Sequence, residues 1–525
     1  MNVTTTDDRR AARIAEGMGL AHWAEVQPDV VAVEAPTGRR TYAELNARAN
    51  QLARALRARG LGPDDGVALI CGNRPEFAEV LAACLRSGLR VTPINWHLTG
   101  DEAGYIAADC GASALIADVR LAESAQGAAA VADGVTVRLA IGGAIDGFDD
   151  YDAALAAEAP DDLDDPVPGG TMFYTSGTTG RPKGVYRSLD ALAATAATQA
   201  ATPNTAGYVA GDDVHLCTGP LYHAAPLVFS LSTPMAWGAT VVMMEKWDAE
   251  AALGLIEAHR VTHTHMVPTM FHRLLSLPRE VRDRHDISSL RWVLHGAAPC
   301  PVEVKRALIE WLGPIVNEYY AASEGAGSVV DSASWLAKPG TVGKPVDGQA
   351  IVGNEDAEPL PAGEIGLVWL KAPAANRFRY HNDDDKTEGA YRGDYFTLGD
   401  VGYLDDDGFL FLTDRSANLI ISGGVNIYPA EIDAVLLEHP AVGDVATIGV
   451  ANPEWGEEVK AVVELQPGWH ASDDLAAELI EHCRAKLARF KCPRSVDFVD
   501  ELPRQDNGKI YKRLLRDRYR SSAPS

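Results

Sequence analysis

The sequence predicts an α/β protein with a large N-terminal domain of sheets packed with helices and a small α+β C-terminal domain. Three observations lead to this prediction. Short apolar runs alternate with helical patterns, the 525 residues exceed the roughly 150 residues of one typical domain, and a polar break falls near residues 405–418. Because such alternation is typical of buried strands joined by helices, we expect largely parallel sheets.

The N-terminal elements follow from local signals. A helix is expected over residues 41–60, where Thr41 and Glu44 form a capping box, leucines and alanines recur at helical spacing, and Gly60 ends the helix. An apolar run at 66–73 predicts a strand. Similar apolar runs predict strands at 213–219, 239–244, 261–267 and 290–295. Among them, a helical pattern predicts a helix at 249–259.

The C-terminal part has elements of its own. Acidic and turn-forming residues at 147–170 predict a surface connection, and the second break contains the runs DDDG and DRSAN. The stretch beyond that break, roughly 110 residues, suffices for a separate small domain. Its strands are expected at 441–450 and 459–465, and its helices at 429–438 and 472–488. Its tail is basic, which fits either a solvated helical face or a surface that attracts phosphate.

Composition excludes several classes of protein. The 73 acidic and 47 basic residues give a formal net charge of −26, which argues against a protein that wraps duplex nucleic acid, because phosphate contacts supply the affinity of such proteins. A locally basic pocket for a small anion stays open. The 46% hydrophobic content is ordinary for a soluble protein, and no apolar run reaches the roughly 18 residues of a membrane span. No secretory signal is evident, so we expect a cytoplasmic protein without stable membrane insertion.

Cysteine and histidine, the usual ligands of zinc, form no recognisable site. The seven cysteines are an odd number, widely scattered, and contain no CxxC pair, so neither a disulfide framework nor a zinc site is expected. Most of them should be small core residues. His263 and His265 are spaced to share one face of a strand, but no third ligand is apparent, which argues against a metal site there.

The strongest local signal is the segment YTSGTTGRPKG at residues 174–184, which follows a strand-like run. Glycines allow close backbone approach, successive N–H groups point at phosphate oxygens, and hydroxyls and a lysine add donors, so the segment predicts a loop that cradles an anion. It is not a Walker loop, because Arg181 and Pro182 intervene and a glycine follows Lys183. The alternative is a glycine-rich surface turn, but such a turn does not explain why so many hydrogen-bond donors gather in one short segment.

This segment resembles the signature phosphate loop of the adenylate-forming superfamily, which includes acyl-CoA synthetases, the adenylation domains of peptide synthetases and beetle luciferases. Further landmarks of the superfamily follow in order: LYHAAP at 221–226, HGAAP at 295–299, EYYAASEG at 318–325, YFTLGDVGYLDDDG at 395–408, DRSANLIISGGVNIYP at 414–429, ANPEWGEEVKA at 451–461 and PRQDNGKIYKR at 503–513. The resemblance covers roughly residues 20–520, and an ordered set of motifs is far more specific than any one of them.

The resemblance, closest to acyl-CoA synthetases, implies an acid–CoA ligase. Such enzymes convert a carboxylate and ATP into an acyl-adenylate and pyrophosphate, and then transfer the acyl group to the thiol of coenzyme A. The implied ligands are a small-molecule carboxylic acid, ATP (or AMP and the acyl-adenylate), Mg²⁺ and CoA. The implied organisation is an N-terminal domain of residues 1–413, which binds ATP and the acyl group, and a mobile C-terminal domain of residues 414–525 with a hinge near 414–418.

Motif by motif, the resemblance assigns the ligands of the nucleotide. The β- and γ-phosphates are expected on Thr175, Ser176, Gly177, Thr178, Thr179, Gly180 and Lys183. Glu324 and Thr178 match the Mg²⁺ site, where the ion screens the repulsion between carboxylate and triphosphate. Asp400 matches the aspartate that accepts the ribose hydroxyls, and Arg415 the arginine near that ribose. Adenine is expected among Gly296, Ala297, Ala298, Tyr320, Ala321 and Ser323.

The resemblance assigns catalysis to three residues. Lys509 matches the lysine that contacts the carboxylate and the α-phosphate during adenylation, Glu324 the metal-binding glutamate, and His223 the histidine at the mouth of the acyl pocket. The strand that lines the CoA tunnel matches Ser422, Gly423, Gly424 and Asn426. The basic tail is a candidate for attracting the CoA phosphates through Lys486, Arg489, Lys491 and Arg494.

The segment around His223 bears on the substrate. Peptide-synthetase domains carry a Phe-Asp pair in this region, whose aspartate binds the amino group of the substrate, and its absence here argues against an amino acid. The neighbouring side chains suit an apolar acid, although a place in the core explains each of them equally well: Leu227, Val228, Phe229, Met235 and Trp237. A medium or long fatty acid, an aryl acid and a bulky terpenoid or polyketide acid all stay open. The sequence also leaves the oligomeric state open, with a homodimer as one possibility.

Four positions depart from the pattern of the superfamily. Ala417 and Asn418 stand where a polar hinge residue and an aspartate are usual, Ala321 replaces a glycine, and Ser323 replaces a threonine. An added methyl group at Ala321 would narrow a densely packed site. Two alternatives therefore stay open: a partial ligase that carries out one half-reaction, such as thioesterification of a preformed acyl-adenylate with adenylation impaired, and a catalytically silent homologue that binds an acyl-adenylate.

Overall fold

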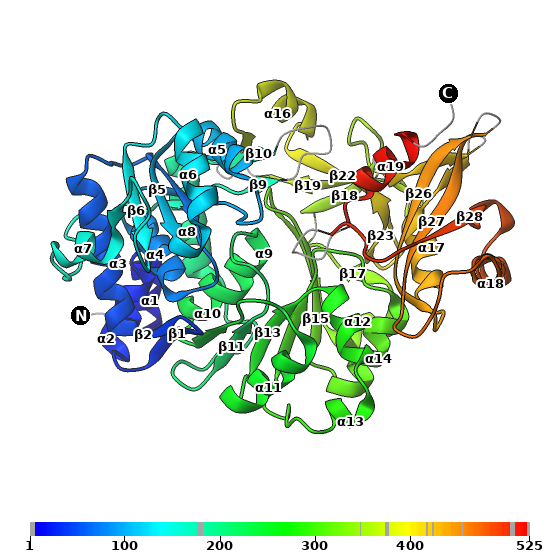
Figure 1. The fold of residues 1–525 in the computed structure, drawn as a ribbon, viewed down its shortest axis with the longest axis horizontal. Coiled ribbons are helices and arrows are strands. Elements are labelled where there is room, and N and C mark those ends of the chain that lie inside the picture. Colours follow the sequence, from blue (N-terminus) through cyan, green and yellow to red (C-terminus); the bar gives the residue numbers. More distant parts are fainter. Residues whose placement is uncertain are drawn as a thin grey trace.

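The computed structural model describes residues 6–175, 182–346, 348–372, 377–415, 418–422, 425–452, 455–504 and 510–521. Within these ranges the strands form five sheets, and the chain passes from the blue helices at the N-terminal side of Figure 1 to the orange C-terminal sheet at the other side. Several residues named above lie outside the described ranges: Ser176, Gly177, Thr178, Thr179, Gly180, Ala417, Gly423, Gly424 and Lys509.

Six described strands form a sheet that is parallel throughout, as the alternation of strands and helices predicts. Its strand β3 (Gly66–Ile70) is fully buried and lies within the predicted run. The helix α3 (Tyr42–Ala58) begins at the predicted capping box of Thr41 and Glu44. The other strands and helices of this part are β4 (Arg90–Pro93), β5 (Ala112–Asp118), β6 (Val137–Ile141), β7 (Asp149–Asp150), β8 (Gly170–Thr171), α4 (Pro75–Arg86), α5 (Gly100–Asp109), α6 (Ala122–Val131) and α7 (Tyr151–Ala156).

Eight described strands form a second sheet, which is parallel in its middle and antiparallel at its two edges. The helix α11 (Ala249–His259) coincides with the predicted helix. Predicted strands are confirmed at β11 (Val214–Cys217), β12 (Thr240–Met243), β13 (His263–Met266) and β14 (Trp292–His295). The remaining elements are β1 (Val31–Ala35), β2 (Gly38–Thr41), β15 (Val316–Ala321), β16 (Ala326–Val330), α12 (Pro268–Ser276) and α14 (Val302–Leu312).

Six further described strands form an antiparallel sheet, so the expectation of largely parallel sheets is wrong for this part of the chain. Its strands β22 (Tyr395–Leu404) and β23 (Leu410–Arg415) form a hairpin, whose turn is the DDDG run: Asp405 Oδ1 accepts the N–H groups of Asp407 and Phe409 at 3.0 and 2.9 Å. The run is thus a tight turn and not a break between domains. The other strands, with a small sheet beside them, are β17 (Thr341–Gly343), β18 (Ala350–Gly353), β19 (Gly366–Lys371), β21 (Tyr391–Arg392), β9 (Tyr174–Thr175), β10 (Lys183–Tyr186) and β20 (Arg379–Tyr380).

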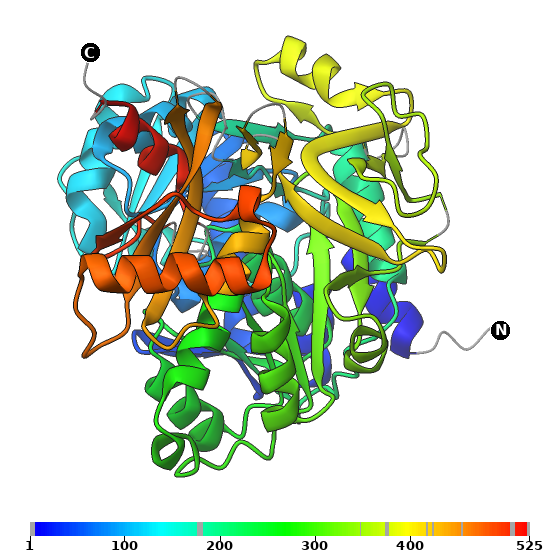
Figure 2. The same ribbon diagram turned by 90° about the vertical axis from the view of Figure 1, so that its right-hand side faces the viewer.

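The C-terminal part folds around a sheet of its own. Five described strands build it: β24 (Ile420–Ser422), β25 (Val425–Ile427), β26 (Val442–Asn452), β27 (Gly456–Leu465) and β28 (Ser495–Val499). The predicted strands and helices of this part are confirmed, the helices as α17 (Pro429–Leu436) and α18 (Asp473–Lys486). Figure 2 shows α18 lying across the sheet, and α19 (Lys512–Ser521) packs against β26.

The remaining helices are short or lie at the edges of the fold. They are α1 (Thr6–Ala15), α2 (Gly19–Val26), α8 (Leu189–Ala201), α9 (Ala224–Pro226), α10 (Thr233–Ala236), α13 (Arg279–Arg282), α15 (Ser332–Ala337) and α16 (Asp384–Ala390). The 3₁₀ turns η1 (Val119–Leu121) and η5 (Arg489–Lys491) and the π-helix η2 (Leu227–Ser232) complete the set. None of the helices in the described ranges is both long and apolar enough to cross a bilayer. The cysteines are unpaired and all but Cys300 are buried, as core residues should be.

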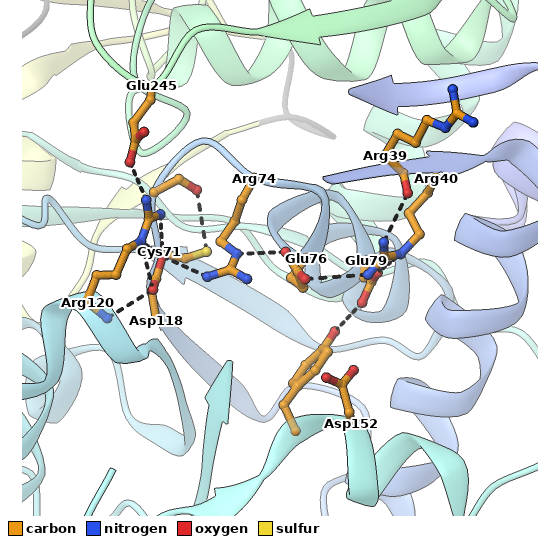
Figure 3. Close-up of polar contacts among 12 residues, drawn as sticks. Arg39, Arg40, Cys71, Arg74, Glu76, Glu79, Asp118, Arg120, Asp152 and Glu245 are labelled. Carbon is orange, nitrogen blue, oxygen red and sulfur yellow. Dashed lines mark hydrogen bonds and ion pairs between the residues drawn. The ribbon is translucent and has the colours of Figure 1, made fainter. Parts of the chain in front are cut away.

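A network of charges with a buried centre extends between the first two sheets (Figure 3). Arg74 lies between two carboxylates: its Nε donates to Glu76 Oε2 at 2.7 Å, and its Nη1 lies 3.0 Å from Asp118 Oδ2. Arg120 contacts the same aspartate and also reaches Glu245, which follows β12 of the second sheet. Arg74 and Asp118 are buried, whereas the pair of Arg120 and Glu245 that connects the segment after β3 to the turn after β12 is exposed and contributes little to stability.

Candidate active site

A cleft of about 2510 Å³ lies beyond the carboxyl ends of the second sheet and extends to the C-terminal part. Its lining includes Val267, Ala297 and Glu324, which follow β13, β14 and β15. From the C-terminal part, Tyr428 and Glu431 also line it. Ligands of open parallel sheets bind beyond the carboxyl ends of the strands, so this cleft is the candidate active site.

The two ends of the predicted phosphate loop meet at the cleft. The strands β9 and β10 pair antiparallel, with Thr175 opposite Lys183, and Thr175 lines the cleft. The ammonium group of Lys183 lies 3.2 Å from the carboxylate of Asp383, and this hydrogen bond raises the pKa of the lysine. The loop is therefore anchored by a short strand pair, and the lysine is a protonated cation beside it.

The segment expected to contact adenine leaves the sheet at the end of β14. A Cβ atom at Gly296 would lie 2.6 Å from the ring and the carbonyl oxygen of Tyr319, so glycine is required there. Ala297 has a φ of +68°, a left-handed conformation that costs a non-glycine residue about 1–2 kcal/mol. Ala297 and Ala298 line the cleft. The strained turn thus lies where the sequence predicts the adenine.

Asp400, the predicted ligand of the ribose, is held by a tyrosine of the neighbouring sheet. The hydroxyl of Tyr320, at the end of β15, donates to Asp400 Oδ2 at 2.7 Å, and both residues are buried in the cleft wall. Arg415 stands opposite Asp400 across the pair of β22 and β23. Three residues that the sequence predicts for one nucleotide therefore come together from two different sheets.

Glu324, the predicted metal ligand, is held in a similar way. The hydroxyl of Tyr380 donates to Glu324 Oε1 at 3.0 Å, and Arg187 Nη2 donates to the carbonyl oxygen of Glu324 at 2.8 Å. Arg187 also donates to the carbonyl oxygen of Ser323 at 3.3 Å, so it fixes the backbone of the predicted motif. Ala321, next to a bulge at the end of β15, lines the same part of the cleft.

Sequence reasoning missed three residues at this end of the cleft. Arg187, Tyr380 and Lys386 all line it, and Lys386 Nζ lies 4.0 Å from the centre of the Tyr380 ring. Burial lowers the pKa of Lys386, although the charge of Glu324 opposes that shift. The signal for Arg187 was its place just after the phosphate loop, in the run KGVYR. Tyr380 and Lys386 stand in no motif that would have revealed them.

His223 lies in a loop that a missed asparagine fixes. Asn73 Nδ2 donates to the carbonyl oxygens of Gly219 and Met244 at 2.9 Å each, and its Oδ1 accepts the N–H of Leu221 at 2.9 Å. Asn73 is 3% exposed and lies beside Arg74 of the buried charge network. His223 lines the cleft at the start of α9. The signal for Asn73 was a polar residue at the end of a buried strand.

The apolar neighbours of His223 divide into two groups. Val228 and Phe229 line the cleft, and the rings of Phe229 and Tyr319 have centroids 4.4 Å apart. Leu227, Met235 and Trp237 do not line it: Leu227 is buried in the core, and Trp237 lies under the guanidinium of Arg10. This part of the cleft therefore has aromatic walls; Val228 and Phe229 fit the explanation as pocket lining, and Leu227 and Met235 fit the alternative of core residues.

The predicted CoA-binding residues of the C-terminal part are only partly described. Ser422 ends β24 and pairs with Gly456 of β27. In the basic tail, Lys491 Nζ lies 2.7 Å from Glu431 and Lys486 pairs with Glu438, so these two cations already have carboxylate partners. Arg494 lies 5.4 Å from the Trp455 ring. Attraction of CoA phosphates by this tail stays a prediction.

Comparisons with known proteins agree with this geometry. The model of the AMP-binding enzyme family matches residues 20–377, and that of the AMP-binding enzyme C-terminal domain matches residues 431–509. A feruloyl-CoA synthase of Amycolatopsis sp. is 35% identical over 95% of this chain and 99% of its own. An indoleacetate–CoA ligase of Aromatoleum aromaticum is 33% identical over 94% and 97%. The crystal structure of ATP-bound MatB from Rhodopseudomonas palustris superposes with a TM-score of 0.81 and 30% identity, over 97% and 99%.

The fold and the cleft define an adenylate-forming enzyme, in which a large α/β part and a smaller C-terminal part share one site. The chain belongs to the family of AMP-binding enzymes, and it is an AMP-forming acid–CoA ligase close to the acyl-CoA synthetases. The resemblance drawn from the motifs is thereby confirmed. ATP, CoA and a carboxylic acid are the substrates of this chemistry.

Proposed function

We propose that this cleft carries out both half-reactions, in a cytoplasmic, Mg²⁺-dependent enzyme that activates an acid with an aromatic and largely apolar body. The observation that carries the proposal is one continuous cleft, which runs from the carboxylates of Glu324 and Asp400 to the rings of Phe229 and Tyr319. A nucleotide at the first end and an acid at the second would meet within one cleft. Such positioning supplies much of the catalysis that two reacting anions need.

At the nucleotide end, the residue roles follow from the contacts. Asp400 accepts the ribose hydroxyls, and Tyr320 keeps that carboxylate in place by its hydrogen bond. Ala297, Ala298 and Tyr320 line the cleft and offer the adenine apolar contacts. Lys183 exchanges the carboxylate of Asp383 for the phosphate oxygens, which keeps its charge compensated before and after binding.

The residues at this end also fit a magnesium ion. Mg²⁺ at phosphate-transfer sites takes one or two carboxylates and completes its shell with phosphate oxygens and water. Glu324 offers such a carboxylate in the cleft, and within the described ranges no three His, Cys, Asp or Glu side chains gather into a metal cluster of their own. The ion would therefore enter with the nucleotide, and when bound it offsets the charge of the triphosphate.

The reaction consists of adenylation of the acid and transfer of the acyl group to CoA. A carboxylate oxygen of the acid attacks the α-phosphorus of ATP, and the bond from that phosphorus to pyrophosphate breaks. The CoA sulfur, after losing its proton, attacks the acyl carbonyl carbon, and AMP leaves. By the motifs, Lys509 is the cation that contacts the reacting carboxylate and the α-phosphate in the first step. His223 is the histidine at the mouth of the acyl pocket. A hinge at 414–418 is supported by the end of β23 at Arg415 and the start of the next sheet at Ile420.

Two observations support an aromatic acid. The feruloyl-CoA synthase and the indoleacetate–CoA ligase, which resemble this chain, act by their names on aromatic acids. In this chain, the rings of Phe229 and Tyr319 line the cleft, and aromatic pairs of this kind favour an aromatic partner. A fatty acid is the alternative, because apolar walls also accept an alkyl chain.

The test separates the two half-reactions. ATP–pyrophosphate exchange is measured with a panel of aromatic and aliphatic acids, and acyl-CoA formation is measured by mass spectrometry from synthetic acyl-adenylates. We expect activity in both assays, Mg²⁺ dependence of the first, and higher kcat/KM for aromatic than for aliphatic acids. Activity in only one assay would identify a partial ligase, silence in both a binding protein, and preference for aliphatic acids would overturn the aromatic assignment alone.

A further inference from the structure

Three rings form part of the cleft wall, and we call them the ring cluster: Phe229, His265 and Tyr319. All three line the cleft. The His265 ring lies 5.7 Å from each of the other two and is stacked on Phe229 at an interplanar angle of 30°. Phe229 comes from η2, whereas His265 and Tyr319 come from β13 and β15. The sheet therefore fixes a histidine inside an otherwise apolar wall.

One nitrogen of this histidine has a partner and the other does not. His265 Nε2 lies 3.1 Å from the hydroxyl oxygen of Tyr319, whereas Nδ1 has no hydrogen-bond partner among the described residues. The side chain is 1% exposed, and burial lowers the pKa of His265 to about 3. The ring is therefore neutral at physiological pH, so that one nitrogen donates and the other accepts. A buried polar atom without a partner costs folding free energy, which a ligand that supplies the partner would restore.

Access to the cleft distinguishes His265 from the other histidines of this sheet. His263, two residues earlier on the same face of β13, uses both nitrogens: Nδ1 lies 2.8 Å from Thr262 Oγ1 and Nε2 lies 2.9 Å from the carbonyl oxygen of Ala206. His215 and His295 have nitrogens without a hydrogen-bond partner in the described structure, but neither lines the cleft. Of the histidines with an unpartnered nitrogen in the described strands of this sheet, only His265 belongs to the cleft lining, which makes its Nδ1 the candidate to bind a substrate.

On the basis of the proposed function, we propose that His265 Nδ1 binds a polar substituent on the acid, and that the substrate is an aromatic acid with a ring hydroxyl. A hydroxyl both donates and accepts, so it satisfies either tautomer of the neutral imidazole. A charged substituent is disfavoured, because it would lose its hydration beside Phe229, and Glu318, which also lines the cleft, is already paired with Lys305 at 2.5 Å. His265 is in this sense a residue that determines specificity.

The test compares matched acids in matched variants. Cinnamic and benzoic acids and their ring-hydroxylated isomers are assayed by ATP–pyrophosphate exchange with the full-length enzyme. We expect one hydroxylated isomer to exceed its parent acid in kcat/KM by about 10-fold or more, because a site built for a hydroxyl leaves a polar atom unpaired with the parent. His265→Phe keeps the ring shape and should abolish this ratio while it retains activity on the parent acid. His265→Gln keeps a polar end and should restore part of the ratio.

His263→Phe is the control for damage to the strand, since that residue is equally buried but lies outside the cleft lining. It should leave the ratio of the two acids unchanged. If His265→Phe does not fold, Tyr319→Phe, which removes the partner of Nε2, should lower the ratio instead. The inference is overturned if the wild type does not distinguish the hydroxylated acids from their parents, or if neither folded variant changes the ratio. Absence of activity on every aromatic acid, with turnover of aliphatic ones, would overturn the proposed substrate class itself.

Discussion

The two ends of the cleft are built on different principles. At the nucleotide end, two carboxylates are each held by a tyrosine hydroxyl from another strand: Asp400 by Tyr320 and Glu324 by Tyr380. At the proposed acid end, the wall contains the ring cluster of Phe229, His265 and Tyr319. Three of the four residues at the nucleotide end stand in motifs of the family: Tyr320, Glu324 and Asp400. Of the ring cluster, only Tyr319 stands in such a motif.

The largest effect should come from Lys509, the cation that the motifs assign to the adenylation step. Lys509→Ala removes a cation from the reacting carboxylate and α-phosphate, and it should lower acid-dependent ATP–pyrophosphate exchange by at least about 100-fold, the scale of losing one contact to developing charge. Thioester formation from a supplied acyl-adenylate should change by less than about threefold. Stopped assays of the two half-reactions measure both. Equal losses in both would contradict a role confined to adenylation.

The next effect belongs to the ribose contact. Asp400→Ala should raise the KM for ATP by about 10- to 100-fold, since hydrogen bonds to a charged group contribute about 1.5–3 kcal/mol each. The KM for the acid should stay near that of the wild type, because the two ends of the cleft bind different substrates. Tyr320→Phe is the matched control: it removes the hydrogen bond to Asp400 but keeps the carboxylate, and its effect should be smaller. A larger effect of the control would mean that Asp400 acts only through the tyrosine.

The fold was predictable where local signals decide it. The capping box of Thr41 and Glu44, the buried run of β3 and the helix α11 depend on residues within a few positions of one another, and the structure confirms them. The antiparallel third sheet was not predictable, because the acidic turn at 405–408 has the same composition whether it closes a hairpin or links two domains. The segment 147–170 hid α7 for a similar reason, since its charges mask the buried Tyr151.

The site was predictable to a similar extent. The motifs named Glu324 and Asp400, and the structure brings both to one cleft. Tyr380, Arg187 and Lys386 were missed, because they come from β20, the end of β10 and α16, and only the folded chain brings these segments together. Residue spacing within a segment cannot report such long-range pairing. The roles of the motif residues themselves stay predictions until the variants are measured.

Replacement of Asn73, which fixes the His223 loop, should affect binding of the acid but not binding of ATP. Asn73→Ala leaves two carbonyl groups and one N–H without their partner, so it should lower the free energy of unfolding by about 2–4 kcal/mol and raise the KM for the acid by about 10-fold, with little change for ATP. Asn50→Ala is the control: that residue is fully buried and bonded to the carbonyl of Pro160, away from the cleft. It should destabilise the protein without changing either KM. If both variants raised the KM for the acid alike, Asn73 would have no specific link to the pocket.

The smallest effect should sharpen the role of the second tyrosine. Tyr380→Phe keeps the ring that contacts Lys386 and removes the hydroxyl that donates to Glu324 Oε1 at 3.0 Å. Because a hydrogen bond of this kind contributes about 1 kcal/mol net, adenylation should fall by about fivefold, and the Mg²⁺ concentration for half-maximal rate should rise by a similar factor.

Tyr391→Phe provides the comparison for this last variant, since its hydroxyl donates to the carbonyl of Phe378 at 3.2 Å and not to Glu324. It should leave the Mg²⁺ dependence unchanged. A shift in Mg²⁺ dependence in Tyr380→Phe alone would assign the tyrosine to holding the metal-binding carboxylate. The same shift in both variants would instead mean that loosening either β20 or β21 weakens the nucleotide end. The contrast with the acid end would then lie in rigidity and not in the paired hydroxyls.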